Sequence, residues 1–142
     1  MVKEFHKVFN VEDHNTPLTK EELEYKKDMV RLRANLIVEE FKEVMEAIGA
    51  ELFSTPIYGR TINSVVSVEA AAKKLCDLLY VVYGTAASFG IPIDECFAEV
   101  HKSNMSKLDK DGNPIYREGD GKVMKSDQYK PADIKKVLEN AN

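Results

Sequence analysis

Four carboxylates stand at positions where the helical pattern predicts apolar surface or its edge. In LIVEEFKEVMEAIGA, residues 36–50, a rotation of about 100° per residue places Glu40 inside a broad apolar arc. Glu39 and Glu43 lie along the edge of that arc. Asp77 is the only charged residue between Leu75 and Pro92. Because an isolated ionised carboxylate in a core is costly, we expect a cationic group to face these side chains.

Two explanations of these carboxylates remain open at this point. Closely spaced glutamates are common on solvated helices, and Asp77 could pair with Lys74 or accept a hydrogen bond from Tyr80 or Tyr83. Alternatively, two carboxylates on one helix that face a third on the next form an all-oxygen site, which suits Mg²⁺ or Mn²⁺. Magnesium in such sites takes phosphate oxygens as further ligands, so this alternative indicates a phosphate ester or anhydride as the substrate.

The residues with candidate chemistry fall in segments whose pattern predicts helices. We expect an irregular connection or lid at 50–66 and a polar, Gly-rich tail at 109–130. The expected helices are a short one within 1–10, a long one from about 19 to 49 opened by a Thr19–Glu22 capping box, one from about 67 to 90, one beginning at Pro92, and a short one after Pro131. This pattern predicts an all-α fold, a helical bundle of four to five helices.

The length and composition of the chain limit its class. With 142 residues, 44% of them hydrophobic, we expect a single domain at 1–142, with a helical core at about 19–107 and a substrate-contacting tail at about 108–130. A net charge of −4 argues against a nucleic-acid binder. Without a signal peptide or a run of about 18 apolar residues, we expect a cytoplasmic protein that does not enter membranes. Cys76 and Cys96 are expected to be free thiols in a reducing compartment.

The helix at 67–90 is apolar on almost every side. One chain of this size has few helices with which to cover it. We therefore expect that homo-oligomerisation completes the bundle, as a homodimer or a homotetramer.

The stretch KLDKDGNPIYRE, residues 107–118, is spaced almost like a calcium-binding EF-hand loop. Its first ligand position is Lys107, whose charge repels the ion, so we interpret the stretch as a turn. Lys107, Asn104, Lys122 and Lys125 could neutralise and orient the phosphates of a bound nucleotide. For each lysine alone, an interaction with a helix C-terminus is an equally good explanation.

Four blocks of the sequence carry a family resemblance. They are LIVEEFKE at 36–43, DLLYVVYGT at 77–85, VHKSNMSK at 100–107, and DGKVMK at 120–125 followed by Tyr129 and Pro131. In this order they resemble the MazG-like, all-α nucleoside triphosphate pyrophosphohydrolases, and more closely their phosphoribosyl-ATP-pyrophosphohydrolase-like branch. The resemblance implies a dimerising helical bundle that hydrolyses a nucleoside triphosphate to the monophosphate and pyrophosphate. It also implies Mg²⁺ held by an EExxE helix and an ExxD helix.

The resemblance assigns roles to the acidic residues. Glu40, Glu43 and Asp77 match family positions and are expected to bind Mg²⁺, while Glu39 is expected to orient or deprotonate the attacking water. Lys74 departs from the family, which has a glutamate at that position. This cation either reduces the number of ions bound or contacts a phosphate itself.

The resemblance also bears on the substrate. The family's asparagine and lysine in the block that matches VHKSNMSK lie close to the nucleotide, which implies the same for Asn104 and Lys107. The expected enzyme is an Mg²⁺-dependent pyrophosphohydrolase acting on a (deoxy)nucleoside triphosphate. The alternatives are phosphoribosyl-ATP as substrate, or a non-catalytic helical dimer that serves as a binding or regulatory module.

Overall fold

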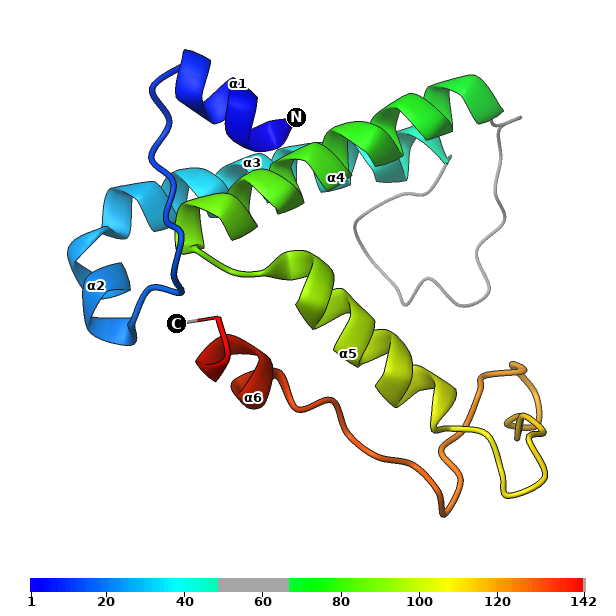
Figure 1. Ribbon diagram of the computed structural model, residues 1–142. Coiled ribbons are helices and arrows are strands. Elements are labelled where there is room, and N and C mark those ends of the chain that lie inside the picture. Colours follow the sequence, from blue (N-terminus) through cyan, green and yellow to red (C-terminus); the bar gives the residue numbers. More distant parts are fainter. Residues whose placement is uncertain (49–66, 142) are drawn as a thin grey trace. The chain divides into compact units, whose positions relative to one another are not determined.

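The computed structural model describes residues 1–48 and 67–141 of the chain. Within these residues it contains six helices and no strand, apart from one isolated antiparallel bridge between Tyr116 and Val123 (Figure 1). The helices are α1 (Val2–Val8), α2 (Lys20–Tyr25), α3 (Lys27–Ala47), α4 (Val68–Phe89), α5 (Ile93–Met105) and α6 (Ile134–Glu139). The prediction of an all-α protein is confirmed.

The chain divides into two compact units, Met1–Gly90 and Ile91–Asn142. In the first unit, α3 and α4 pack against each other in opposite directions, α1 packs on α4, and α2 packs on α3 (Figure 1). The buried apolar residues of this unit are Val44 and Met45 of α3 and Ala86 and Ala87 of α4. The packing of α3 against α4 therefore places residues 39–43 opposite Asp77.

The predicted ends of the helix at 67–90 are confirmed by its caps. The hydroxyl of Ser67 accepts a hydrogen bond from the backbone N–H of Ala70 at 3.3 Å. At the other end Gly90 adopts a left-handed conformation with φ of 71°, which terminates the helix. The helix after Pro92 and the short helix after Pro131 are also present, as α5 and α6.

The prediction of one continuous helix at 19–49 is wrong: the helix is broken at Lys26. The expected capping box is present, with Thr19 and Glu22 exchanging hydrogen bonds. However, α2 ends at Tyr25, and Lys26 has φ of −101° and ψ of 34°. No Pro or Gly marks this break; the Lys26 ammonium instead pairs with Glu12. The expected end at Gly49 and the expected lid at 50–66 lie outside the described residues.

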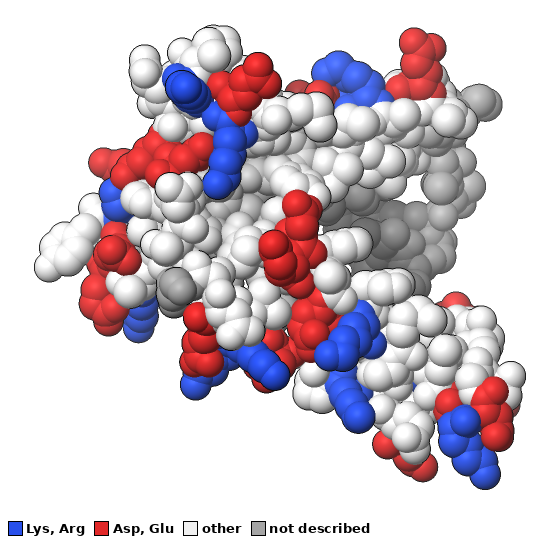
Figure 2. All heavy atoms as spheres, in the orientation of Figure 1, with Lys and Arg blue, Asp and Glu red and all other residues white. Residues whose placement is uncertain are grey.

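α4 is less buried than its sequence predicts. Its last turns are covered, but three apolar residues at a spacing of four, Leu75, Leu79 and Tyr83, are 49%, 55% and 40% exposed. We call these three residues the apolar stripe. Figure 2 shows how few charged side chains lie over the middle of α4. In the part of the chain that the structure describes, no single helix is long and apolar enough to cross a membrane, and only α4 and α5 counted together across their break reach that limit.

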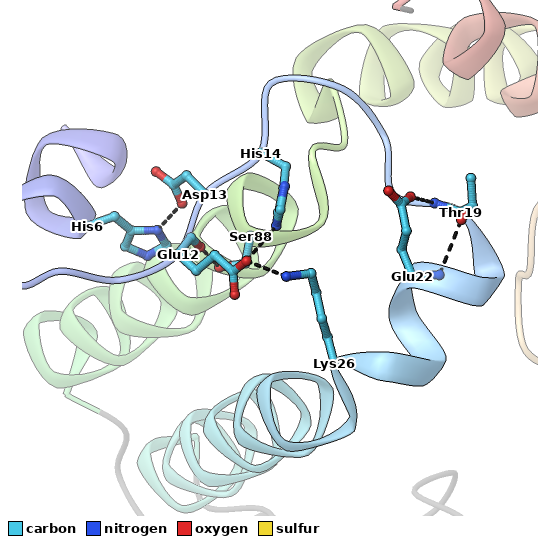
Figure 3. Close-up of polar contacts among 8 residues, drawn as sticks. All are labelled: His6, Glu12, Asp13, His14, Thr19, Glu22, Lys26 and Ser88. Carbon is cyan, nitrogen blue, oxygen red and sulfur yellow. Dashed lines mark hydrogen bonds and ion pairs between the residues drawn. The ribbon is translucent and has the colours of Figure 1, made fainter.

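The polar segment between α1 and α2 is held to the rest of the first unit by side-chain contacts (Figure 3). Glu12 pairs with Lys26 and lies 3.2 Å from the ring of His14. The fully buried hydroxyl of Ser88 on α4 donates a hydrogen bond to the backbone carbonyl of Glu12 at 2.8 Å. These contacts hold the segment against α4, and the hydrogen bond from Lys26 lowers the pKa of Glu12.

Two basic side chains are buried between α1, α3 and α4. His6 pairs through Nδ1 with Asp13, and its Nε2 lies 3.5 Å from the guanidinium of Arg33. Burial lowers the pKa of Arg33. A Cβ atom at Gly84 would lie 3.1 Å from the ring of His6 and 3.2 Å from Arg33. Because Gly84 has no Cβ atom, α4 leaves room for the side chains of His6 and Arg33.

Replacing Gly90 by Ala is expected to lower the free energy of unfolding by about 3 kcal/mol. Two costs add together: the strain of an alanine in the left-handed conformation, and a steric clash of its Cβ atom. The new Cβ would lie 1.8 Å from the backbone oxygen of Thr16. Urea denaturation followed by circular dichroism measures the change. Gly121→Ala is the matched control, since Gly121 also has a positive φ, of 66°, but nothing within 4 Å of an added Cβ. An equal effect of both changes would contradict the role of Thr16.

The second unit pairs α5 with α6 and carries the polar tail. The interpretation of the EF-hand-like stretch as a turn agrees with its hydrogen bonds. One carboxylate oxygen of Asp109 accepts from the backbone N–H groups of Asp111 and Asn113, at 2.9 and 2.8 Å. Both cysteines are free, as predicted, and Cys96 of α5 is buried, which raises the pKa of its thiol.

Candidate active site

The structure brings together three of the four predicted carboxylates. Glu40 and Glu43 lie one turn apart on α3, and the opposite direction of α4 places Asp77 beside them. One oxygen of each lies within 4.8 Å of the others, and all three residues are half-buried. We call Glu40, Glu43 and Asp77 the acidic cluster. Oxygens on opposite sides of an Mg²⁺ ion lie about 4 Å apart, so the spacing is close to that of a metal site.

One atom of the acidic cluster indicates that a ligand fits there. The Oε2 atom of Glu40 is buried and has no hydrogen-bond partner among the described residues. A buried carboxylate oxygen without a partner costs free energy, because it has lost its hydration without compensation. A divalent cation bound between the three carboxylates would supply the missing interaction. The donor set of oxygens alone is the one that Mg²⁺ and Mn²⁺ prefer.

Two lysines of α4 face the acidic cluster. The Lys74 ammonium pairs with Glu43 across the two helices and lies 3.8 Å from Asp77. Lys73 donates a hydrogen bond to Asp77 at 2.5 Å. The bond from Lys73 lowers the pKa of Asp77, and the bond to Glu43 raises the pKa of Lys74. The pairing of Asp77 with Lys74, one of the alternatives that the sequence left open, is therefore present, and Lys73 is a second partner that sequence reasoning did not single out.

Glu39 is exposed and lies outside the acidic cluster. It directly precedes Glu40, so a rotation of about 100° around the helix axis separates the two side chains. This position on the solvent side of α3 is the one expected from the helical pattern.

The predicted phosphate-contacting residues of the second unit fall into separate places. Asn104 and Lys107 are together at the end of α5, where the Lys107 ammonium donates to the amide oxygen of Asn104 at 2.7 Å. Lys125 lies over the ring of Tyr129, 4.1 Å from its centre. A hydrogen bond with Ser103 is the main cause that lowers the pKa of Tyr129, and Lys125 adds to it.

A pocket of about 630 Å³ lies where the tail meets the end of α5. Sequence reasoning did not single out this pocket, because it depends on contacts between distant residues. The hydroxyl of Ser103 donates to the backbone carbonyl of Lys130 at 2.7 Å, and the N–H of Lys130 donates to Ser106 at 2.8 Å. Glu99 and Lys102 also line it.

Comparison with known proteins assigns the chain to a family of hydrolases. The profile of a family described as phosphoribosyl-ATP pyrophosphohydrolase matches residues 2–104. The chain belongs to this family, and through it to the MazG-like, all-α nucleoside triphosphate pyrophosphohydrolases. It is accordingly a hydrolase that acts on phosphoric anhydrides.

Two further comparisons add little to this assignment. No curated protein matches the chain. A crystal structure from Exiguobacterium sp. 255-15, described provisionally as an NTP pyrophosphohydrolase, is 25% identical and aligns with 99% of this chain and 90% of its own, with a TM-score of 0.44. That score is too low to establish a shared fold.

Proposed function

We propose that the protein is an Mg²⁺-dependent enzyme that hydrolyses a normal or modified (deoxy)nucleoside triphosphate to the monophosphate and pyrophosphate. The observation that carries the proposal is the acidic cluster, in which a buried Glu40 oxygen has no hydrogen-bond partner among the described residues. Membership of a pyrophosphohydrolase family supports the reaction class.

Glu40, Glu43 and Asp77 would hold the ion in this proposal. Once bound, Mg²⁺, or Mn²⁺ in its place, would offset charge on the phosphoryl group and lower the pKa of a bound water. Glu39 would orient the attacking water and accept its proton on the carboxylate. The water oxygen forms a bond to the α-phosphorus, and the bond from that phosphorus to the bridging oxygen breaks, so that pyrophosphate leaves.

The substrate's phosphates would be bound by cations and an amide of the chain. Lysine ammonium groups act as point charges, and the asparagine amide donates a directed hydrogen bond. The proposed substrate-binding residues are Lys74 in the first unit and Asn104, Lys107, Lys122 and Lys125 in the second. The proximity of Asn104 to Lys107 supports a joint role for these two.

Phosphoribosyl-ATP is the second candidate substrate, because the matching family is named for its hydrolysis. This substrate would need room for a second ribose phosphate. The test is to measure pyrophosphate release from all common NTPs and dNTPs and from phosphoribosyl-ATP, with Mg²⁺ and with EDTA. Release from nucleoside triphosphates that EDTA abolishes would support the first proposal. Release from phosphoribosyl-ATP alone would favour the second, and no release from any of them would contradict both.

Replacing Lys107 by Met is expected to raise KM about 10-fold and to change kcat little, because one charge-assisted hydrogen bond to phosphate is lost. Steady-state kinetics with the preferred nucleotide measures both constants. Lys135→Met serves as the control, since Lys135 is an exposed lysine of α6 that pairs with Glu139. If Lys107→Met and Lys135→Met behave alike, Lys107 does not contact the substrate.

We further propose that the active protein is a single-domain chain that assembles as a homodimer or homotetramer. The exposed apolar stripe on α4 supports assembly, because a continuous apolar strip on a helix is normally covered. The family match at residues 2–104 includes parts of both compact units, which supports their treatment as one functional domain.

A further inference from the structure

Lys74 is the cation that joins both sides of the acidic cluster. It is on α4, three residues before Asp77, and its ammonium reaches Glu43 on α3. Its side chain is 30% exposed, whereas the neighbouring Lys73 is 67% exposed and contacts Asp77 along the same helix. Lys74 thus lies between the two helices with the carboxylates, while Lys73 approaches them from the solvent side.

The charges around the acidic cluster favour the binding of one divalent ion. Its three carboxylates already face two ammonium groups, that of Lys74 between the helices and that of Lys73 on the solvent side, so one divalent cation exceeds the remaining negative charge. A second divalent ion would lie within a few ångströms of the first and of Lys74. No further described carboxylate belongs to the cluster to offset that repulsion.

We infer that Lys74 is a permanent counter-cation of the acidic cluster, so that the protein alone binds one divalent ion and Lys74 takes the place of a second. The inference rests on the proposed function, which assigns the cluster to a metal ion. The inference also explains how Lys74 would contact the substrate. An ammonium group next to the bound ion donates hydrogen bonds to phosphate oxygens, which a second metal ion would otherwise bind.

The experiment is a calorimetric titration of the substrate-free protein with Mn²⁺, which needs no catalytic activity. We expect one ion per chain in the wild type and in Lys74→Met. The Met variant should bind Mn²⁺ about 10-fold more tightly, because a cation about 4 Å from the ion no longer repels it. Lys74→Glu should bind two ions per chain, since it adds a fourth carboxylate. Two ions of similar affinity in the wild type, or unchanged affinity in Lys74→Met, would overturn the inference.

Two controls separate the effect of Lys74 from general charge and from misfolding. Lys42→Met removes the same charge from an exposed residue next to Glu43 and should leave Mn²⁺ affinity near the wild-type value. Lys74→Arg keeps the charge and should also bind like the wild type. A strong gain in affinity in Lys42→Met would show that net charge alone is responsible, and would overturn the inference. Thermal melts by circular dichroism verify that each variant is folded.

A further variant distinguishes this inference from the proposed function. Glu43→Gln removes a proposed ligand and should weaken Mn²⁺ binding at least 10-fold. If Glu43→Gln has no effect, the ion binds elsewhere and the proposed function loses its metal site. If Glu43→Gln weakens binding while Lys74→Met leaves it unchanged, the metal site stands and only the inference about Lys74 is overturned.

Discussion

Replacing Glu43 by Gln, or Asp77 by Asn, is expected to lower kcat/KM for the preferred nucleotide by about 10³-fold. Each change keeps the size of the side chain but replaces a charged oxygen ligand with a neutral amide. Because the bound ion would stabilise charge on the phosphoryl group mainly in the transition state, the loss should fall chiefly on kcat. Pyrophosphate release at saturating Mg²⁺ measures the effect.

Glu46→Gln is the matched control for these two changes. Glu46 follows Glu43 on α3, is exposed and lies outside the acidic cluster, so its loss should change kcat/KM by less than about 2-fold. Activity that survives both Glu43→Gln and Asp77→Asn would refute the assignment of the metal site. A similar loss in Glu46→Gln would indicate that the effect is general to α3 and not specific to the cluster.

The members of the acidic cluster were predictable because the signals that mark each of them are local. Helical periodicity alone places Glu40 on the inner side of α3, and Asp77 stands out on α4 as the only charged residue between Leu75 and Pro92. The end of α4 was equally predictable from Gly90, whose left-handed conformation terminates the helix. Each of these conclusions depends on residues within a few positions of one another in the sequence.

The features that sequence reasoning missed depend on contacts between distant residues. The break at Lys26 has no Pro or Gly, and accompanies an ion pair with Glu12, fourteen residues earlier. The pairing of Lys74 with Glu43 spans 31 positions, and no spacing rule within one helix predicts it. The sequence left open whether salt bridges or a metal ion balance these carboxylates, and the structure has features of both. Glu43 and Asp77 form ion pairs with lysines, whereas one Glu40 oxygen has no hydrogen-bond partner among the described residues.

Replacing Leu79 by Asp in the middle of the apolar stripe is expected to convert the protein to a monomer. The wild type should have at least twice the chain mass of 16.0 kDa. Leu79 is 55% exposed within one chain, and burying a leucine at an interface contributes about 2 kcal/mol. An aspartate at the same position would instead leave a charge without a partner in a desolvated interface, with a further cost of several kcal/mol. Light scattering or sedimentation equilibrium gives the mass directly.

Tyr25→Asp is the control for the assembly, because it places the same charge on another exposed apolar residue. Tyr25 ends α2, is 92% exposed and lies outside the apolar stripe, so this variant should keep the mass of the wild type. A monomeric wild type would contradict assembly altogether. An oligomer that tolerates Leu79→Asp would show that another surface mediates it.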